Sequence, residues 1–399
     1  MAFCQSFLGS LLVIGWTCRL TQRSVLKAWW KQSSQRPPGE SFSQHLASIP
    51  SVQHLQHWPN WFCRQNFRAA ARRGPGTSWV ALGWSLVKAT VSSLGQNLRL
   101  GWQSILNTWV VTLPAGLLWW FGWYDGWNNS FNKGYEQAVA GPVISLLGIG
   151  WFIAAMFYVP LAQARQAVTG EWRSFYQFSL LLKVARARWL ACVGLALLYV
   201  LCALPLGVLK ITPMFSPQNH PHLAGLNDAE VLQHLNRYFF WSALLLLPGY
   251  VGLRLVAGRI YAAGLLRLLQ QKRISPDHLS DFEKQSLDRL DLLQTPPQRE
   301  RHFLVRLAAW SVTRVGRIFS GFALVLLWFA FVAQIYVTEF FNYHGALGWL
   351  NQPLVQLPWF HYLPTRLKNP FGEAFAGVLI LGLFFLFRRL FRRRTKGVD

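Results

Sequence analysis

Long apolar runs constrain this chain more than any other feature, and the stretch from Trp102 to Arg165 is the most informative. It holds an apolar run from Trp102 to Trp123, a short polar turn, and a second apolar run from Val139 to Ala162. Each run is close to the ~20 residues that a helix needs to cross a bilayer. The turn, WWFGWYDGWNNSF, is crowded with tryptophan, which is enriched where lipid tails meet water. The stretch therefore predicts a transmembrane hairpin.

The composition agrees with a membrane protein. Hydrophobic residues make up 52% of the 399 residues and charged residues only 14%, whereas soluble domains carry about 25% charge. Further apolar runs occupy residues 189–209, 238–256, 318–337 and 374–387. We predict an all-α fold, a polytopic transmembrane helical bundle of about six spans in three hairpins, with amphipathic interfacial helices on the cytoplasmic side. Residues 3–18 form a shorter apolar segment that is either interfacial or a marginal seventh span.

This pattern divides the chain into five regions. We expect a basic N-terminal region, a first hairpin, a second hairpin with an amphipathic lead-in, a cytoplasmic connector, and a third hairpin with a basic tail. These regions cover residues 1–101, 102–162, 163–258, 259–316 and 317–399.

Residues 78–100 predict an amphipathic helix. Apolar side chains recur there at spacings of three and four, with basic and polar side chains between them, which is typical of a helix with a narrow apolar stripe. The stripe consists of Val80, Trp84, Val87, Val91, Leu94 and Leu98. We expect this helix to lie flat on the inner leaflet, since its polar face is basic; packing against other helices is the alternative.

Two helix starts have local signals. Asn227 stands three residues before Glu230, which predicts a capped helix from Asp228. Ser275 followed by Pro276 predicts a second helix over residues 275–294. This second helix carries five of the 15 acidic residues of the chain. Its mixed charge predicts a solvated surface that could meet a protein partner.

The basic residues predict one orientation. Residues 1–101, 163–188, 254–317 and 388–399 together hold 34 of the 39 lysines and arginines, and the alternate loops hold the other five. Because loops rich in lysine and arginine stay in the cytoplasm, we expect the C-terminus to be cytoplasmic and the protein to be a multi-pass component of the inner (plasma) membrane.

The net charge of +24 could also indicate nucleic acid. The charges flank apolar runs, however, and no nucleic-acid module is recognisable. We therefore expect the basic loops to contact anionic lipid headgroups of the bilayer, with no nucleic-acid partner.

The sequence nominates no catalytic, cofactor-binding or metal-binding residue, and we expect no cofactor. Ionisable groups deep in a span would mark function, but Arg254 lies near the inner end of its run, where it can reach the headgroups. His54 and His57 could share a helix face as metal ligands, although Pro50 and Pro59 bracket them and a loop pair is the favoured interpretation.

These observations favour a non-enzymatic scaffold or accessory component of the inner membrane. The alternative is a transporter or export permease, which a bundle with repeated hairpins could support. A third hypothesis is a membrane-embedded enzyme that modifies lipid or glycan.

Overall fold

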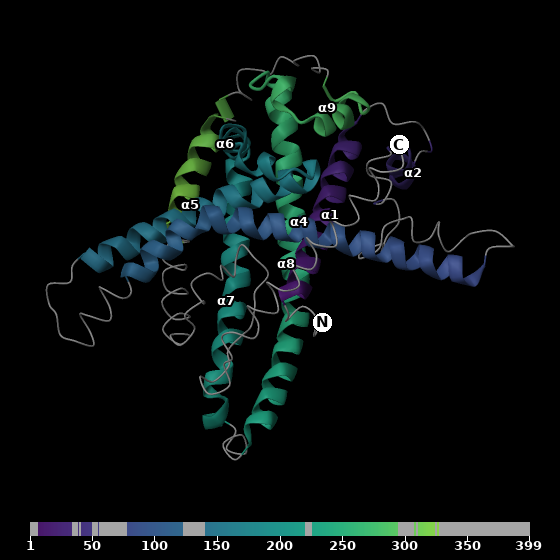
Figure 1. Cartoon of the computed structure of the whole chain (residues 1–399). Coiled ribbons are helices and arrows are strands. Elements are labelled where there is room, and N and C mark those ends of the chain that lie inside the picture. The colour runs from purple at the N-terminus through teal and green to yellow at the C-terminus, as the bar shows by residue number, and fades with distance from the viewer. Residues whose placement is uncertain are drawn as a thin grey trace.

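The structure is a computed structural model that describes residues 7–33, 39, 41–49, 55, 78–122, 140–219, 226–293, 307–308, 310–323 and 325–326. Within these ranges every regular element is a helix (Figure 1), which confirms the all-α prediction. The elements are α1 (Phe7–Gln32), α2 (Phe42–Ala47), α4 (Trp79–Gly122), α5 (Ala140–Thr169), η4 (Trp172–Tyr176), α6 (Phe178–Ala187), α7 (Trp189–Asn219), α8 (Asp228–Gln270), η6 (Pro276–His278) and α9 (Asp281–Asp288). Residues 310–323 add a further helical segment.

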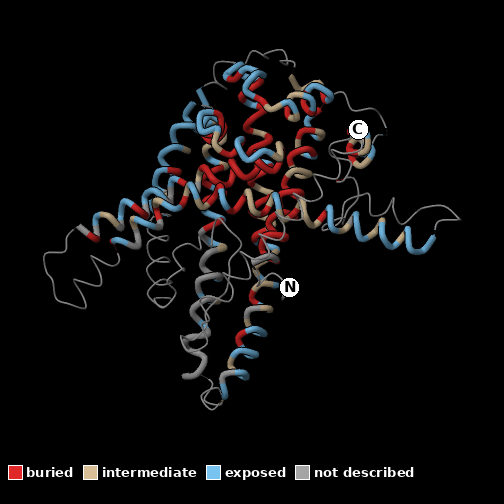
Figure 2. The backbone as a smooth tube through the Cα atoms, in the orientation of Figure 1, coloured by how far each residue is buried: buried red, intermediate tan, exposed pale blue. Residues whose placement is uncertain are grey.

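The largest core lies where α1, α5, α6 and the C-terminal part of α8 meet (Figure 2). Its most deeply buried large side chains include Trp29, Phe175, Leu181, Tyr261 and Leu265. The N-terminal half of α8 is different, because Trp241 and Leu245 are 60% and 69% exposed. The C-terminal half of α8 thus belongs to a packed helical body, whereas its N-terminal half exposes apolar side chains.

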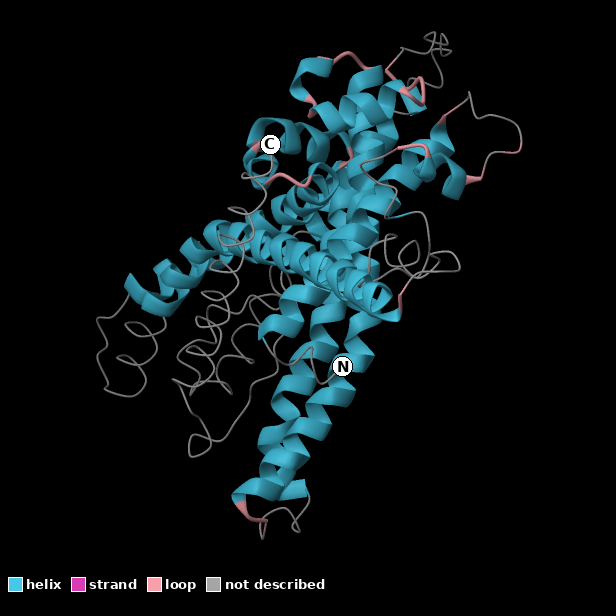
Figure 3. Cartoon of the chain, turned by 45° about the vertical axis from the view of Figure 1, so that its right-hand side comes forward, coloured by secondary structure: helices cyan, strands magenta, loops and turns pink. Residues whose placement is uncertain are grey.

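The helices run in two directions. α7 and α8 lie side by side and extend away from the body, and α1 runs along α8 (Figures 1 and 3). α4 and α5 form a second antiparallel pair that lies crosswise to α7 and α8 in both views. α6 and α9 cover the end of the body opposite the α7–α8 tip. The two hairpins are therefore not parallel members of one bundle.

Among the described residues, one helix is both long and apolar enough to cross a membrane, namely residues Ala229–Gln270 within α8. This finding gives weak support to the predicted membrane association.

α4 differs from the prediction of a separate helix over 78–100. It is a continuous helix of 44 residues that includes the first predicted span. Gly101 lies within this helix and packs against the backbone of α1. The predicted boundary between 101 and 102 therefore falls inside one helix.

Two other helices are longer than expected. α1 continues through Gln32, well beyond the apolar segment 3–18. α7 continues to Asn219 through Pro213 and Pro217, well beyond the apolar run 189–209.

The two predicted caps have different outcomes. Asn227 accepts from the Glu230 N–H at 2.9 Å and forms a capping box at the start of α8, as predicted. Ser275 caps only the short helix η6. α9 begins later, at a second capping box between Ser280 and Glu283. The predicted single helix over 275–294 is therefore wrong, because the chain turns at Leu279 and α9 ends at Asp288.

Candidate functional site

A buried ion pair fastens α9 to the helical body. Arg165 Nη2 of α5 lies 3.2 Å from Glu283 Oε2 of α9, and both side chains are fully buried. The same nitrogen donates to the His278 carbonyl oxygen at 3.1 Å. Removing one member of such a pair leaves an uncompensated charge in a low dielectric, at a cost of about 3–5 kcal/mol. The pair therefore makes the position of α9 depend on α5.

Both carboxylate oxygens of Glu283 are occupied. Oε2 also accepts from the backbone N–H of Ser280 at 2.9 Å and from its hydroxyl at 3.1 Å. Oε1 accepts from the hydroxyl of Tyr261 on α8. Glu283 thus bonds three elements at once, and its burial and saturation suit a structural junction rather than general acid–base chemistry, which needs a carboxyl group within reach of a substrate.

Two further arginines are buried inside the body. Arg19 of α1 donates to Ser93 of α4, to the carbonyl oxygen at 3.1 Å and to the hydroxyl at 3.3 Å. Arg254 of α8 donates to the Tyr250 hydroxyl at 3.0 Å and lies over the Tyr250 ring. Arg254 is only 6% exposed, so the expectation that it reaches the headgroups differs from the structure. It lies inside the body, beside Cys18 of α1 and Tyr199 of α7.

η4 is held against α4 by polar bonds. Asn107 Nδ2 donates to the Trp172 carbonyl oxygen at 3.1 Å, and the Tyr176 hydroxyl donates to Asn107 Oδ1 at 3.0 Å. Burial raises the pKa of Tyr176 above its ordinary value. One buried amide therefore fixes both ends of η4.

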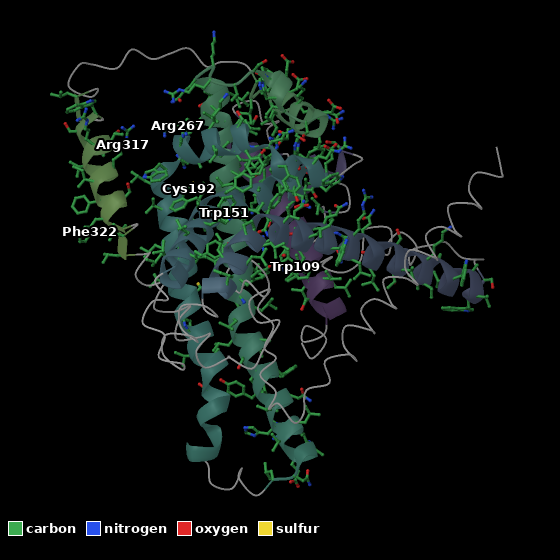
Figure 4. The ribbon with its side chains drawn as sticks, turned by 60° about the vertical axis from the view of Figure 1, so that its left-hand side comes forward. Trp109, Trp151, Cys192, Arg267, Arg317 and Phe322 are labelled. Atoms are coloured by element: carbon green, nitrogen blue, oxygen red, sulfur yellow. The ribbon has the colours of Figure 1, made fainter. Side chains whose placement is uncertain are left out.

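The segment 310–323 packs against the start of α7. Trp189 Nε1 donates to the Ser320 hydroxyl at 2.8 Å. Figure 4 shows this segment, which carries Arg317 and Phe322, at the edge of the helical body. Its packing places the start of the third predicted hairpin beside the second.

α9 presents a charged face to solvent. Asp281, Gln285 and Asp288 are exposed, while Glu283 and Leu287 are buried on the opposite side. Lys284 Nζ of α9 lies 3.7 Å from Asp277 Oδ1 of η6. The predicted solvated helix is thus solvated on one side only.

Sequence reasoning missed the Arg165–Glu283 junction. Arg165 falls in the basic segment 163–188 and Glu283 in the helix predicted to be solvated, and the two residues lie 118 positions apart. The local signal was the spacing of Ser280 and Glu283, which matches a capping box. His54 and His57 lie outside the described residues, and within those residues no three histidine, cysteine, aspartate or glutamate side chains are grouped to hold a metal ion.

Comparison with protein families, with curated proteins and with solved structures finds no match to this chain.

Proposed function

We propose that this chain is a polytopic protein of the inner (plasma) membrane that acts without catalysis, as a scaffold or accessory component. The observation that carries the proposal is the division of α8. Its N-terminal half exposes Trp241 and Leu245, whereas Ala257, Tyr261 and Leu265 in its C-terminal half are at most 1% exposed. Such a helix suits a protein that is anchored by one end and presents a packed body at the other.

The charge pattern supports a polytopic arrangement with both the basic N-terminal region and the C-terminus in the cytoplasm. The loop between α7 and α8 falls in one of the segments poor in lysine and arginine, and the opposite end of both helices adjoins basic segments. By the positive-inside rule the helical body then lies in the cytoplasm. The apolar runs taken alone predict three hairpins with about six spans.

The orientation has a direct test. A reporter fused after Lys396 in the full chain should read cytoplasmic. A periplasmic reading would overturn the even number of spans.

The exposed face of α9 is the part best placed to meet a protein partner. Buried bonds hold α9 against the helical body, so its outward side chains have a defined position. A partner that binds this face would therefore lose little conformational entropy in ordering it. The face carries Asp281 and Asp288, which favours a partner with a basic surface, because complementary charge steers association.

Site-specific crosslinking in intact membranes tests this role. A photo-crosslinking residue at Gln285 should give one discrete protein adduct, and the double variant Asp281→Lys with Asp288→Lys should abolish it. The same residue at Leu245 serves as the control on the proposed lipid-facing side and should give no such adduct. No adduct at Gln285, or an adduct that survives charge reversal, would overturn the scaffold role at α9.

A further inference from the structure

The crossing of α4 over α1 sets the direction of α4 relative to α7 and α8, which the apolar runs do not reveal. A Cβ added to Gly15 of α1 would lie 1.9 Å from the Asn97 carbonyl oxygen of α4, and one added to Gly101 would lie 2.0 Å from the Leu11 carbonyl oxygen. The two backbones therefore touch at two points. Since α1 runs along α8 and α4 lies crosswise to it (Figures 1 and 3), this contact holds α4 across the α7–α8 pair.

The crossing lies at a definite level of α8. Leu11, Ile14 and Ile105 pack around Tyr250, so α4 meets the body near this residue. The part of α8 from Asp228 to Tyr250 would be about 35 Å long at 1.5 Å per residue, close to the ~30 Å hydrocarbon thickness of a bilayer. If that part spans the membrane, α4 lies at its cytoplasmic boundary.

The surface of α4 suits that boundary. Within the apolar stripe, Trp84, Val87 and Val91 are 71%, 53% and 63% exposed. Trp79, at the start of the helix, is 85% exposed. Lys88 and Arg99 are exposed beside it, and the helix contains no acidic residue. Tryptophan and a basic flank are typical of helices that lie in the headgroup region of anionic membranes.

Apolar side chains are also exposed farther along the hairpin. Leu113 and Phe121 on α4, and Val143 and Leu147 on α5, are exposed. These side chains are apolar and exposed like those of α8, which the proposed function assigns to lipid. The same occupant, a lipid bilayer, therefore accounts for both.

We propose that the α4–α5 hairpin lies along the cytoplasmic surface of the membrane, with its apolar face in the boundary between headgroups and acyl chains, and does not cross the bilayer. This inference rests on the proposed membrane function. It leaves the charge pattern intact, because a hairpin adds an even number of crossings and its removal changes the side of no other loop. It replaces the first predicted hairpin, residues 102–162, by an interfacial one.

Depth measurements on the full chain test the proposal. Spin labels are attached to single cysteines at Val87, Leu113 and Trp241, each in a chain whose native cysteines are replaced, and the protein is placed in nanodiscs that contain anionic phospholipid. All three positions are exposed, so the labels should not disturb packing. Depth is read from the relative accessibility of each label to oxygen and to a water-soluble nickel chelate.

We expect Val87 and Leu113 to lie at similar shallow depths, about 5–10 Å into the headgroup and acyl boundary, and Trp241 to lie near the midplane, about 15 Å deep. Leu113 is near the centre of the apolar run 102–123, so a crossing hairpin would bring it as deep as Trp241. That result would overturn the interfacial hairpin. A label at Val87 that is fully water-accessible would overturn the lipid contact of the stripe. A shallow or hydrated Trp241 would instead overturn the membrane function itself.

Discussion

Gly15 of α1 lies against the backbone of Asn97 in α4, so closely that a methyl group on the glycine would collide with the Asn97 carbonyl oxygen. One helical turn away the relationship is reversed, since Gly101 of α4 lies against the Leu11 carbonyl oxygen of α1. Each helix thus supplies one glycine and one carbonyl to the crossing. Small residues at a helix crossing permit this backbone approach, and the crossing sets the orientation of the whole α4–α5 pair.

Alanine at Gly15 should therefore separate α1 from α4. Overpacking of a tight site costs about 1–3 kcal/mol, and here the obstacle is backbone, which cannot rotate away. The matched control is Gly83→Ala on α4, where the added Cβ meets nothing within 4 Å and should be neutral or slightly stabilising.

Thermal unfolding in detergent can be followed with a thiol-reactive dye, because Cys18 and Cys192 are buried free thiols. Gly15→Ala should lower the apparent Tm, and Gly101→Ala should do the same. Equal melting of Gly15→Ala and Gly83→Ala would contradict the close crossing.

Removing the charge of one member of the Arg165–Glu283 pair should lower the free energy of unfolding substantially. Glu283→Gln keeps the size of the side chain but leaves the buried Arg165 charge without its counter-charge, so we expect a loss of about 3–5 kcal/mol. Adding Arg165→Met removes the second charge and should restore much of that loss, since replacement of a whole buried pair is often neutral.

The same dye assay measures this prediction, with Asp281→Asn as the control. Asp281 is exposed on the same helix, and its change should stay within about 0.5 kcal/mol. A double variant no more stable than Glu283→Gln would show that the charge pairing is not what fastens α9.

Ser280 and Ser275, the two capping serines of the connector, should differ in how much they contribute to stability. Ser280 caps α9 and bonds to the buried Glu283, so Ser280→Ala should cost about 1–2 kcal/mol. Ser275 caps a helix of only three residues at an exposed site, so Ser275→Ala should cost less. Hydrogen exchange of the α9 amides would show the difference, and faster exchange in Ser275→Ala than in Ser280→Ala would contradict the assignment of the caps.

A feature of this structure can be predicted from the sequence when the residues that determine it are close together along the chain. The all-helical fold and the start of α8 at Asn227 follow from local signals, and both are observed. The Ser280 cap is equally local, but the earlier Ser275 competes for the same role. The burial of Glu283 could not be foreseen, because its partner Arg165 is distant in sequence and a mixed-charge helix is more often solvated.

The direction of α4 could not be predicted from the sequence, for a different reason. An apolar run of about 20 residues satisfies the length of a span whether it crosses the bilayer or lies along it. What decides is the crossing at Gly15 and Gly101, and glycine is too common in membrane helices to mark one pair in advance. Length and hydropathy thus predict the environment of a helix better than its direction.

The bond network around η4 gives a last expectation. Asn107→Ala removes the donor to the Trp172 carbonyl oxygen and the acceptor for the Tyr176 hydroxyl. Each lost hydrogen bond costs about 0.5–1.5 kcal/mol, so η4 should detach from α4 more often. Limited digestion with trypsin reports this directly, because Arg173 is exposed within η4. Cleavage after Arg173 should speed up strongly in Asn107→Ala and less in Tyr176→Phe, which loses one bond only. Trp172→Ala keeps its backbone carbonyl bond and should cleave at nearly the wild-type rate; faster cleavage there than in Asn107→Ala would show that the exposed indole, and not the buried amide, holds η4 in place.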